Sequence, residues 1–383
     1  MATVFRNKKK RLVSLLLIPA ILLCSAALSI GVVSAARDWE EEDSGLDADV
    51  IFAEAEQDLE ALTDLSGAQF VTVTDKRDVD IDSSGIWVIE GNATGVTINV
   101  DAPENAEVFL FLNGLSIENR DRPCIYVASV GKIYIIPVED TVLKVTKEFR
   151  KDPERKANAV IYSCTDLTLC GEAPLSIVSP KNGIVCRDKL RIIEGDYDIT
   201  AGSKAIVADN AIWIASGNFR LTAETDGLHA ENDDDSMQGS VYIGGGHFEI
   251  NVNDDGIHGQ ALVQIDGGSI SITADEGIES TWVLITGGTT NIQASSDGIN
   301  AGWKSAAYRP KVEITGGNVT VVMDGDDADA IDSNADLVIS GGTVRIEGAG
   351  IDYEGELDFS GGTVIIEGEY VRDIPNTNKP KRG

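Results

Sequence analysis

Basic residues are scarce in this chain: 31 lysines and arginines stand against 63 aspartates and glutamates, so the formal net charge is −32. A surface this negative repels nucleic acid and anionic lipid, which argues against a nucleic-acid partner. Aromatic residues make up only 6% of the sequence, and the segment after residue 65 lacks the apolar periodicity of amphipathic helices. The composition therefore indicates an acidic, β-rich protein whose surface attracts divalent cations.

A long hydrophobic run occurs at the N-terminus. The basic residues 8–11 precede the apolar residues 12–33, and small residues follow at 34–36. This order is typical of a secretory signal peptide, here predicted at 1–36, although a retained membrane anchor is the alternative. Cleavage would bring the net charge to −37 and would place the protein outside the cell or on its surface, free of the membrane.

Cysteines are also few, and four remain after such a cleavage: Cys124, Cys164, Cys170 and Cys186. In an oxidising compartment four cysteines allow three pairings. The alternative is that they are small buried apolar residues, and the sequence leaves this choice open.

The chain divides into four segments by composition. The signal peptide (1–36) is followed by an acidic linker with one amphipathic helix near 50–65, together 37–69. Residues 70–368 form a repetitive β domain, and residues 369–383 form a basic C-terminal tail.

An internal repeat with spacings of 20 to 29 residues dominates the β domain. Each unit contains an apolar pair, Gly-Gly, a second apolar pair and an Asp-Gly-Ile corner; Gly-Gly recurs six times, from Gly245 to Gly362. Pairs with period 2 are short, half-buried strands. Three such strands cannot fold alone, but they form one rung of a parallel β-helix. We therefore predict an all-β solenoid with rungs of about 20–25 residues, preceded by a short helix.

An acidic residue precedes the corner glycine of successive units: Asp226, Asp255, Glu276, Asp297 and Asp329, the last followed by alanine. Stacked rungs place such residues about 4.8 Å apart, where two unit charges repel by about 1 kcal/mol in water and about 3–4 kcal/mol at an effective dielectric of 20. A cation between rungs relieves this repulsion, and calcium prefers carboxylate and carbonyl oxygens. Asp254 and the segments 231–235 and 324–329 add nearby acids. The sequence predicts calcium sites, with a solvated edge of Asp-Gly turns as the alternative.

Two histidines occupy the same outward position on adjacent rungs, His229 and His258. Stacked imidazoles near carboxylates suit zinc, but no cysteine or third histidine joins them. We therefore expect a surface imidazole pair.

At this point the sequence resembles a known family. The segments "SSGIWVIEG", "FLNGLSIENRDRPCIYV" and "TDGLHAENDDDSMQGSVYIGGGHFEINVNDDGIHG" are similar to those of secreted carbohydrate-binding proteins, over about residues 70–368. The resemblance implies a right-handed parallel β-helix like that of pectate lyases, calcium held between rungs, and binding of plant-type or cell-wall polysaccharides such as cellulose and polygalacturonate (pectin). The resemblance implies that the acids at the family's corners are Asp226, Asp255, Glu276 and Asp297, and that the adjoining loop contributes Asn232, Asp233 and Asp234.

The loop "GWKSAAYRP" (302–310) departs from the repeat and places aromatic and basic residues on an acidic wall. Sugar rings stack on aromatic faces such as those of Trp303 and Tyr308. Lys304 and Arg309 suit a uronate carboxylate, which a calcium ion beside the corner acid would bridge to the protein. The alternative is that the two aromatic residues only pin the loop to the wall.

A second aromatic pair, Trp213 and Tyr242, lies at equivalent positions of adjacent rungs and would form a stacking platform for a neutral glucan. Alternatively, the helix near 50–65 covers it.

These features favour a calcium-dependent polysaccharide-binding protein over an enzyme. A pectate-lyase-like reaction needs a positioned base, and the local candidates, Arg309 and Lys304, lie on one loop, which positions a base poorly. The lyase and a structural or adhesive surface protein remain the alternatives.

Overall fold

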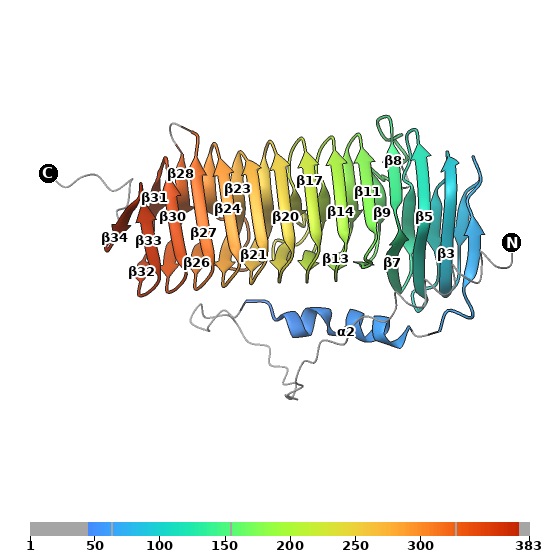
Figure 1. The fold of residues 1–383 in the computed structure, drawn as a ribbon, viewed down its shortest axis with the longest axis horizontal. Coiled ribbons are helices and arrows are strands. Elements are labelled where there is room, and N and C mark those ends of the chain that lie inside the picture. Colours follow the sequence, from blue (N-terminus) through green and yellow to red (C-terminus); the bar gives the residue numbers. More distant parts are fainter. Residues whose placement is uncertain (1–44, 63, 154, 326–327, 375–383) are drawn as a thin grey trace.

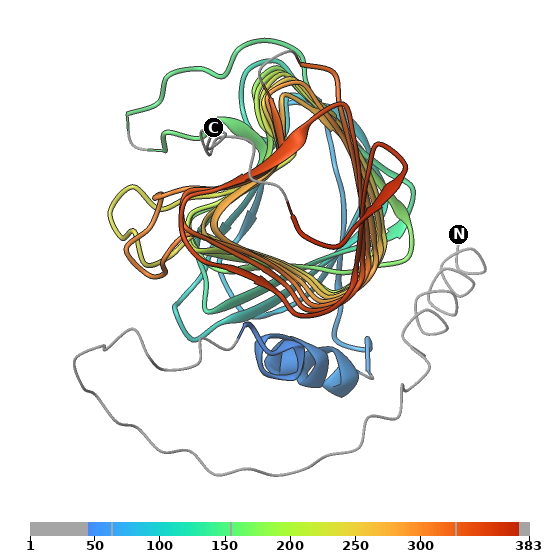
Figure 2. The same ribbon diagram turned by 90° about the vertical axis from the view of Figure 1, so that its left-hand side faces the viewer.

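The computed structural model describes residues 45–62, 64–153, 155–325 and 328–374. The chain forms a parallel β-solenoid of about 12 turns with one short helix on its N-terminal side (Figure 1). Seen along its axis the solenoid is triangular, and three sheets form its sides (Figure 2). The predicted parallel β-helix preceded by a helix is confirmed. The predicted signal peptide lies outside the described residues.

Each turn contributes a strand to each sheet in order. The first sheet contains β1 (Gln69–Thr72), β3 (Gly85–Thr94), β5 (Glu107–Asn119), β7 (Lys132–Glu139), β10 (Leu167–Leu169), β13 (Lys189–Ile192), β16 (Ala211–Ile214), β19 (Ser240–Ile243), β26 (Lys311–Ile314), β29 (Asp336–Ile339) and β32 (Leu357–Phe359).

The second sheet takes up the C-terminal parts of β3 and β5. Its other strands are β8 (Thr141–Val145), β11 (Pro174–Ser179), β14 (Asp196–Ala201), β17 (Asn218–Ala223), β20 (His247–Val252), β22 (Ser269–Ala274), β24 (Thr289–Ala294), β27 (Asn318–Met323), β30 (Thr343–Glu347) and β33 (Thr363–Ile366). The last strand, β34 (Glu369–Val371), pairs with β33 in the antiparallel direction.

The third sheet carries the Asp-Gly corners. Its strands are β2 (Val79–Ile81), β4 (Ile98–Asp101), β6 (Ile125–Ser129), β9 (Ala159–Ser163), β12 (Asn182–Cys186), β15 (Ile206–Ala208), β18 (Leu228–Ala230), β21 (Asp255–Ile265), β23 (Glu276–Ile285), β25 (Asp297–Ala301), β28 (Asp329–Ser333) and β31 (Gly350–Tyr353). The long strands β21 and β23 continue into the first sheet.

The core is a set of aliphatic ladders inside the triangle. In the third sheet one ladder runs through Ile206, Leu228, Ile257, Ile278, Ile299 and Ile331, which pair in register and are fully buried. Four of these residues follow the corner glycine of the sequence repeat, whereas Ile206 and Ile331 follow an alanine. Burial of such continuous apolar surface stabilises turns that could not fold alone.

The corner glycines are required by close stacking of the turns. A Cβ atom on Gly277 would lie 2.3 Å from the carbonyl oxygen of Gly298, and one on Gly298 would lie 2.5 Å from that of Ala330. Alanine is tolerated at position 330 because the register between β28 and β31 shifts there. Asp329 pairs with Gly350 and Ile331 pairs with Ile351, so no residue of the next turn pairs with Ala330.

Helix α2 (Ala48–Ala61) lies along the first sheet (Figures 1 and 2). The Asp47 side chain caps it by accepting a hydrogen bond from the backbone N–H of Asp49, and Phe52, Ala55 and Leu59 form its buried face. Lys132 on β7 makes ion pairs with acids of the helix. No helix within the described ranges is long and apolar enough to cross a membrane.

The four cysteines of the β domain are free thiols. Cys124, Cys170 and Cys186 are buried, and Cys164 is exposed. Burial raises the pKa of the Cys124 and Cys170 thiols to about 12, so both are neutral and pack as small apolar residues.

Candidate functional site

The corner acids form one column along the edge of the third sheet. Asp255 pairs with Glu276, and Asp297 pairs with Asp329. The register of β18 with β21, extended by two residues, places Asp226 next to Asp255 in this column. The register of β15 with β18 likewise places Lys204 one turn further toward the N-terminus. The sequence repeat predicted the acids of this column but missed Lys204, because "SKAIVA" replaces the Asp-Gly pattern in that turn.

A second column lies three residues after the first on the outer face of the same sheet. Its members pair from turn to turn: His229, His258, Glu279, Asn300, Asp332 and Asp352. The two columns place polar side chains side by side along five turns. Sequence reasoning identified only the two histidines here, although the fixed offset of three from each corner acid was available as a signal.

Charges are balanced at the N-terminal end of the columns. Asp226 is 1% exposed, and its carboxylate accepts hydrogen bonds from Lys204 and from Nδ1 of His229, which lies 2.6 Å from Oδ2. Burial would raise the pKa of Asp226, but these two partners outweigh it and lower the pKa to about 2. The other carboxylate oxygen, Oδ1, is buried and has no hydrogen-bond partner in the described part of the chain.

The next two turns contain a second paired group. Nδ1 of His258 lies 2.9 Å from Oδ2 of Asp255 and 2.9 Å from Oε2 of Glu279, and Lys304 pairs with the other oxygen of Glu279. Burial would lower the pKa of His258, but the hydrogen bonds to both carboxylates raise it to about 9.

The C-terminal half of the columns carries uncompensated negative charge. Burial, together with repulsion from neighbouring carboxylates, raises the pKa values of Glu276 and Asp332 to about 7 and also raises that of Asp297. In the described parts of the chain, no ion pair involves any of these three residues. The Asp297 carboxylate accepts a hydrogen bond from the backbone N–H of Asp329 at 3.1 Å.

An acidic loop, residues 231–239, connects β18 to β19. The side chain of Asn232 closes it by accepting hydrogen bonds from the backbone N–H groups of Asp234 and Asp235, both at 2.9 Å. Asp233 and Asp234 are exposed, as is Asp254 at the neighbouring corner. Burial, followed by repulsion from adjacent corner acids, raises the pKa of Asp254.

The loop 302–310 follows β25 and projects from the same corner of the triangle as the acidic loop (Figure 2). Ser305 donates a hydrogen bond to the Ser236 carbonyl and so ties the two loops together. Trp303 is 65% exposed, whereas Tyr308 packs edge-on against Trp282 with ring centroids 5.2 Å apart. Arg309 pairs with the carboxylate of Asp336.

The second aromatic pair lies under helix α2. Tyr242 is 2% exposed, its ring centroid lies 6.0 Å from that of Phe52, and its hydroxyl donates to Asp266. Trp213 is partly buried beneath the guanidinium of Arg191, 5.1 Å from the ring centroid. Trp303 is therefore the most exposed aromatic side chain among the predicted sugar contacts.

A family profile described as carbohydrate-binding domain-containing protein matches residues 75–282 and 275–370. The chain belongs to this carbohydrate-binding family. The matched ranges include both columns and the two loops described above.

Two further similarities agree with this assignment. A carbohydrate-binding domain-containing protein from Acetivibrio thermocellus is 31% identical over 131 residues, which cover 33% of this chain and 46% of that protein. The chain thus spans about half the length of this curated relative. A solved structure of a polysaccharide lyase-like protein from C. thermocellum, a gadolinium derivative, is similar with a TM-score of 0.52 and 27% identity over 58% of this chain and 96% of that chain.

Proposed function

We propose that this protein is a secreted, calcium-dependent polysaccharide-binding protein whose ligand is polygalacturonate or cellulose. The observation that carries the proposal is the juxtaposition of a carboxylate column with excess negative charge and a loop that exposes Trp303. Carbohydrate binding follows from the family; the metal, the type of polysaccharide and the contact residues belong to the proposal.

Trp303 would provide the stacking surface for a sugar ring. Its side chain is free to do so because Tyr308, rather than Trp303, anchors the loop through Trp282. Aromatic faces bind the C–H side of a sugar, and a flat exposed indole suits a polymer of repeating rings. Arg309 is 53% exposed and would offer its guanidinium to an acidic sugar in exchange for Asp336.

Calcium fits the chemistry of the C-terminal half of the columns. The carboxylates there have pKa values raised first by burial and then by repulsion from neighbouring carboxylates, and a bound divalent cation would favour their charged forms against both effects. Asp297, Asp329 and Asp332 are the residues we assign to such an ion, with Glu276 beside them. The unpartnered Oδ1 of Asp226 marks a second place where an oxygen ligand is available.

The relative from C. thermocellum adds support for a hard cation, because its structure is a gadolinium derivative. Gadolinium is a trivalent lanthanide that takes oxygen ligands, as calcium does. In this chain the matching donors would be the carboxylates of the corner column rather than the paired acids next to the histidines.

The contacts of the basic residues favour binding without chain cleavage. Burial would lower the pKa of Lys304, but its hydrogen bond to Glu279 raises it, so the amine stays protonated and is a poor base. Arg309 is engaged with Asp336. A lyase remains the second candidate because the similar solved structure is described as polysaccharide lyase-like.

The test is a sedimentation assay with insoluble polygalacturonate and with cellulose, run in calcium and in chelator, with unsaturated product recorded in the same tubes. We expect calcium-dependent binding without product. Trp303→Ala should weaken binding about two- to tenfold, as expected for loss of about 0.5–1.5 kcal/mol of stacking. Tyr370→Ala is the matched control, because Tyr370 is 77% exposed and lies at the C-terminal end.

The metal arm uses Asp297→Asn with Asp196→Asn, an exposed acid on β14, as its control. Only Asp297→Asn should lower the affinity for polysaccharide in calcium and reduce the difference between binding in calcium and binding in chelator. Binding that is equal in calcium and in chelator would contradict the calcium proposal, and product release would make the protein a lyase.

A further inference from the structure

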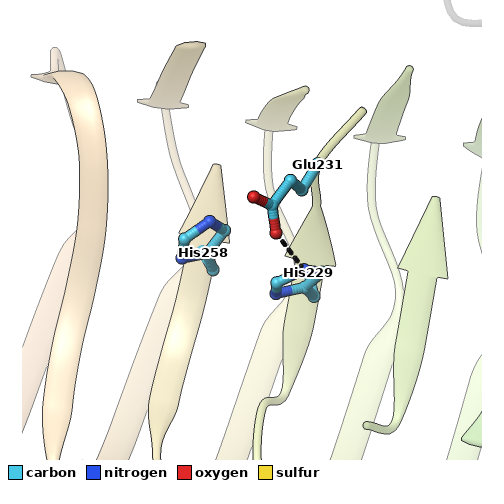
Figure 3. A group of neighbouring side chains, drawn as sticks. All are labelled: His229, Glu231 and His258. Carbon is cyan, nitrogen blue, oxygen red and sulfur yellow. Dashed lines mark hydrogen bonds and ion pairs between the residues drawn. The ribbon is translucent and has the colours of Figure 1, made fainter. Parts of the chain in front are cut away.

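The two histidines of the second column form a group with Glu231. His229 on β18 pairs in register with His258 on β21, and their rings are stacked with centroids 4.5 Å apart and an interplanar angle of 18°. Oε2 of Glu231, one residue past the end of β18, lies 3.1 Å from Nε2 of His229. One potential ligand atom from each residue lies within 4.8 Å of the other two (Figure 3).

The opposite side of each imidazole is held by a carboxylate. Nδ1 of His229 faces Asp226, and Nδ1 of His258 faces both Asp255 and Glu279. Histidines that bind metals almost always donate their second ring N–H to a carboxylate or carbonyl, which fixes the tautomer and makes the other nitrogen a better ligand. Here both rings have this support, because Nδ1 of each one faces the carboxylate of the corner acid three residues before it.

Nε2 of His258 is available for such a ligand. In the part of the chain that the structure describes, no hydrogen bond or ion pair involves this atom. The ring itself is 7% exposed, whereas the Glu231 side chain is 42% exposed. The imidazoles are therefore packed against the sheet, and the group reaches solvent on the side of Glu231.

The surrounding charges match a divalent cation. The carboxylates that contact the two rings are Asp226, Glu231, Asp255 and Glu279. Two of them are paired with lysines, Lys204 and Lys304. A metal bound to the imidazoles displaces their extra proton. With both rings neutral, two negative charges are in excess, which one divalent ion would neutralise.

We propose that His229, Glu231 and His258 form a binding site for a divalent transition metal of the zinc class. Imidazole nitrogen is a ligand for zinc, copper and nickel, whereas calcium takes oxygen ligands. Three protein ligands with an open side are the arrangement in which zinc keeps a position for water or a further ligand. The site shares no ligand with the calcium site assigned above to Asp297, Asp329 and Asp332 and does not depend on it.

Sequence analysis expected only a surface imidazole pair at these positions. It lacked a third ligand because Glu231 was grouped with the acidic loop, and the carboxylates at Nδ1 become apparent only when the turns are stacked. The third ligand and the carboxylates behind the two rings thus depend on contacts between turns that the repeat alone does not specify.

The test is metal binding by the full chain after exhaustive chelation, using zinc and cobalt in the presence of excess calcium. We expect one zinc or cobalt ion per chain that excess calcium does not displace, with the visible absorption of cobalt bound to nitrogen ligands. Glu231→Gln should weaken zinc binding at least about tenfold, and His229→Gln or His258→Gln should weaken it more.

The third histidine of the chain is the matched control. His247 is exposed on β20, so His247→Gln should leave zinc affinity unchanged. Glu231 is exposed, so its variant keeps the test valid if the histidine variants fail to fold. The proposal is overturned if the wild-type chain binds no zinc, if calcium displaces the zinc, or if Glu231→Gln and His247→Gln bind it equally well.

Discussion

Gly277 shows at the scale of one residue why the corners of this solenoid use glycine. A Cβ atom there would meet the Gly298 carbonyl oxygen at 2.3 Å, a distance that only a shift of the turn would relieve. We expect Gly277→Ala to lower the free energy of unfolding by about 1–3 kcal/mol, the usual cost of overpacking a close contact. Urea denaturation followed by circular dichroism measures this change.

The matched control is Gly67→Ala, because no atom lies within 4 Å of a Cβ atom built on Gly67. That change should leave the urea midpoint nearly unaffected. Equal effects at the two glycines would mean that the stacking contact at the corner is not what selects glycine there.

For single residues of the corner column, the sequence predicted the position of the acids but not the partner of each one. The repeat predicted that Asp226, Asp255 and Asp297 share one column, because a fixed period places equivalent residues above one another. It could not predict that Lys204 neutralises the first of them. Lysine at a corner departs from the repeat, and its partner was identified only when the turns were stacked.

At the scale of an element, helix α2 covers the first sheet through a narrow apolar face. Phe52 is 3% exposed and contacts the ring of Tyr242. Phe52→Ala would remove most of this contact, and a buried phenylalanine commonly contributes about 3–5 kcal/mol. We expect the helix to detach while the solenoid stays folded, measured as faster proteolysis within residues 48–61.

Val50→Ala is the control for this change, since Val50 lies on the same helix but is 71% exposed. Its proteolysis rate should match that of the wild type. If Phe52→Ala is also cleaved at the wild-type rate, the helix is held mainly by the ion pairs of Lys132.

Elements differ in how far the sequence specifies them. Period-2 apolar pairs predicted the strands, and the amphipathic segment predicted the helix, which begins at Ala48 and ends at Ala61 rather than spanning 50–65. The contacts of the loop 302–310 were not predictable, because Trp303 and Tyr308 are both aromatic residues of this loop and the sequence does not show which of them is buried. Only packing against Trp282 separates the anchored ring from the exposed one.

At the scale of the whole molecule, crowded acids make stability depend on pH when metal is absent. The folded-state pKa values of Glu276 and Asp332 are about 7, above the values of about 4 for these groups in an unfolded chain. The folded state therefore binds more protons than the unfolded state between these values. These two groups make stability fall as pH rises from about 4 to 7, and their own contribution is constant above that range.

Urea midpoints of the full chain in chelator, taken across this pH range, measure the effect. The double variant Glu276→Gln, Asp332→Asn should show a flatter profile, because its amides do not titrate. A wild-type midpoint that rises with pH over this interval would contradict the assignment of raised pKa values.

The antiparallel strand β34 has a consequence for self-assembly. A solenoid of parallel strands ends in backbone N–H and C=O groups that another molecule can extend, turn after turn, into a fibre. At the C-terminal end of the second sheet, β34 folds back on β33 and reverses the strand direction. An incoming parallel turn no longer finds a matching template on that sheet, so the hairpin disfavours end-to-end pairing of two molecules through the second sheet.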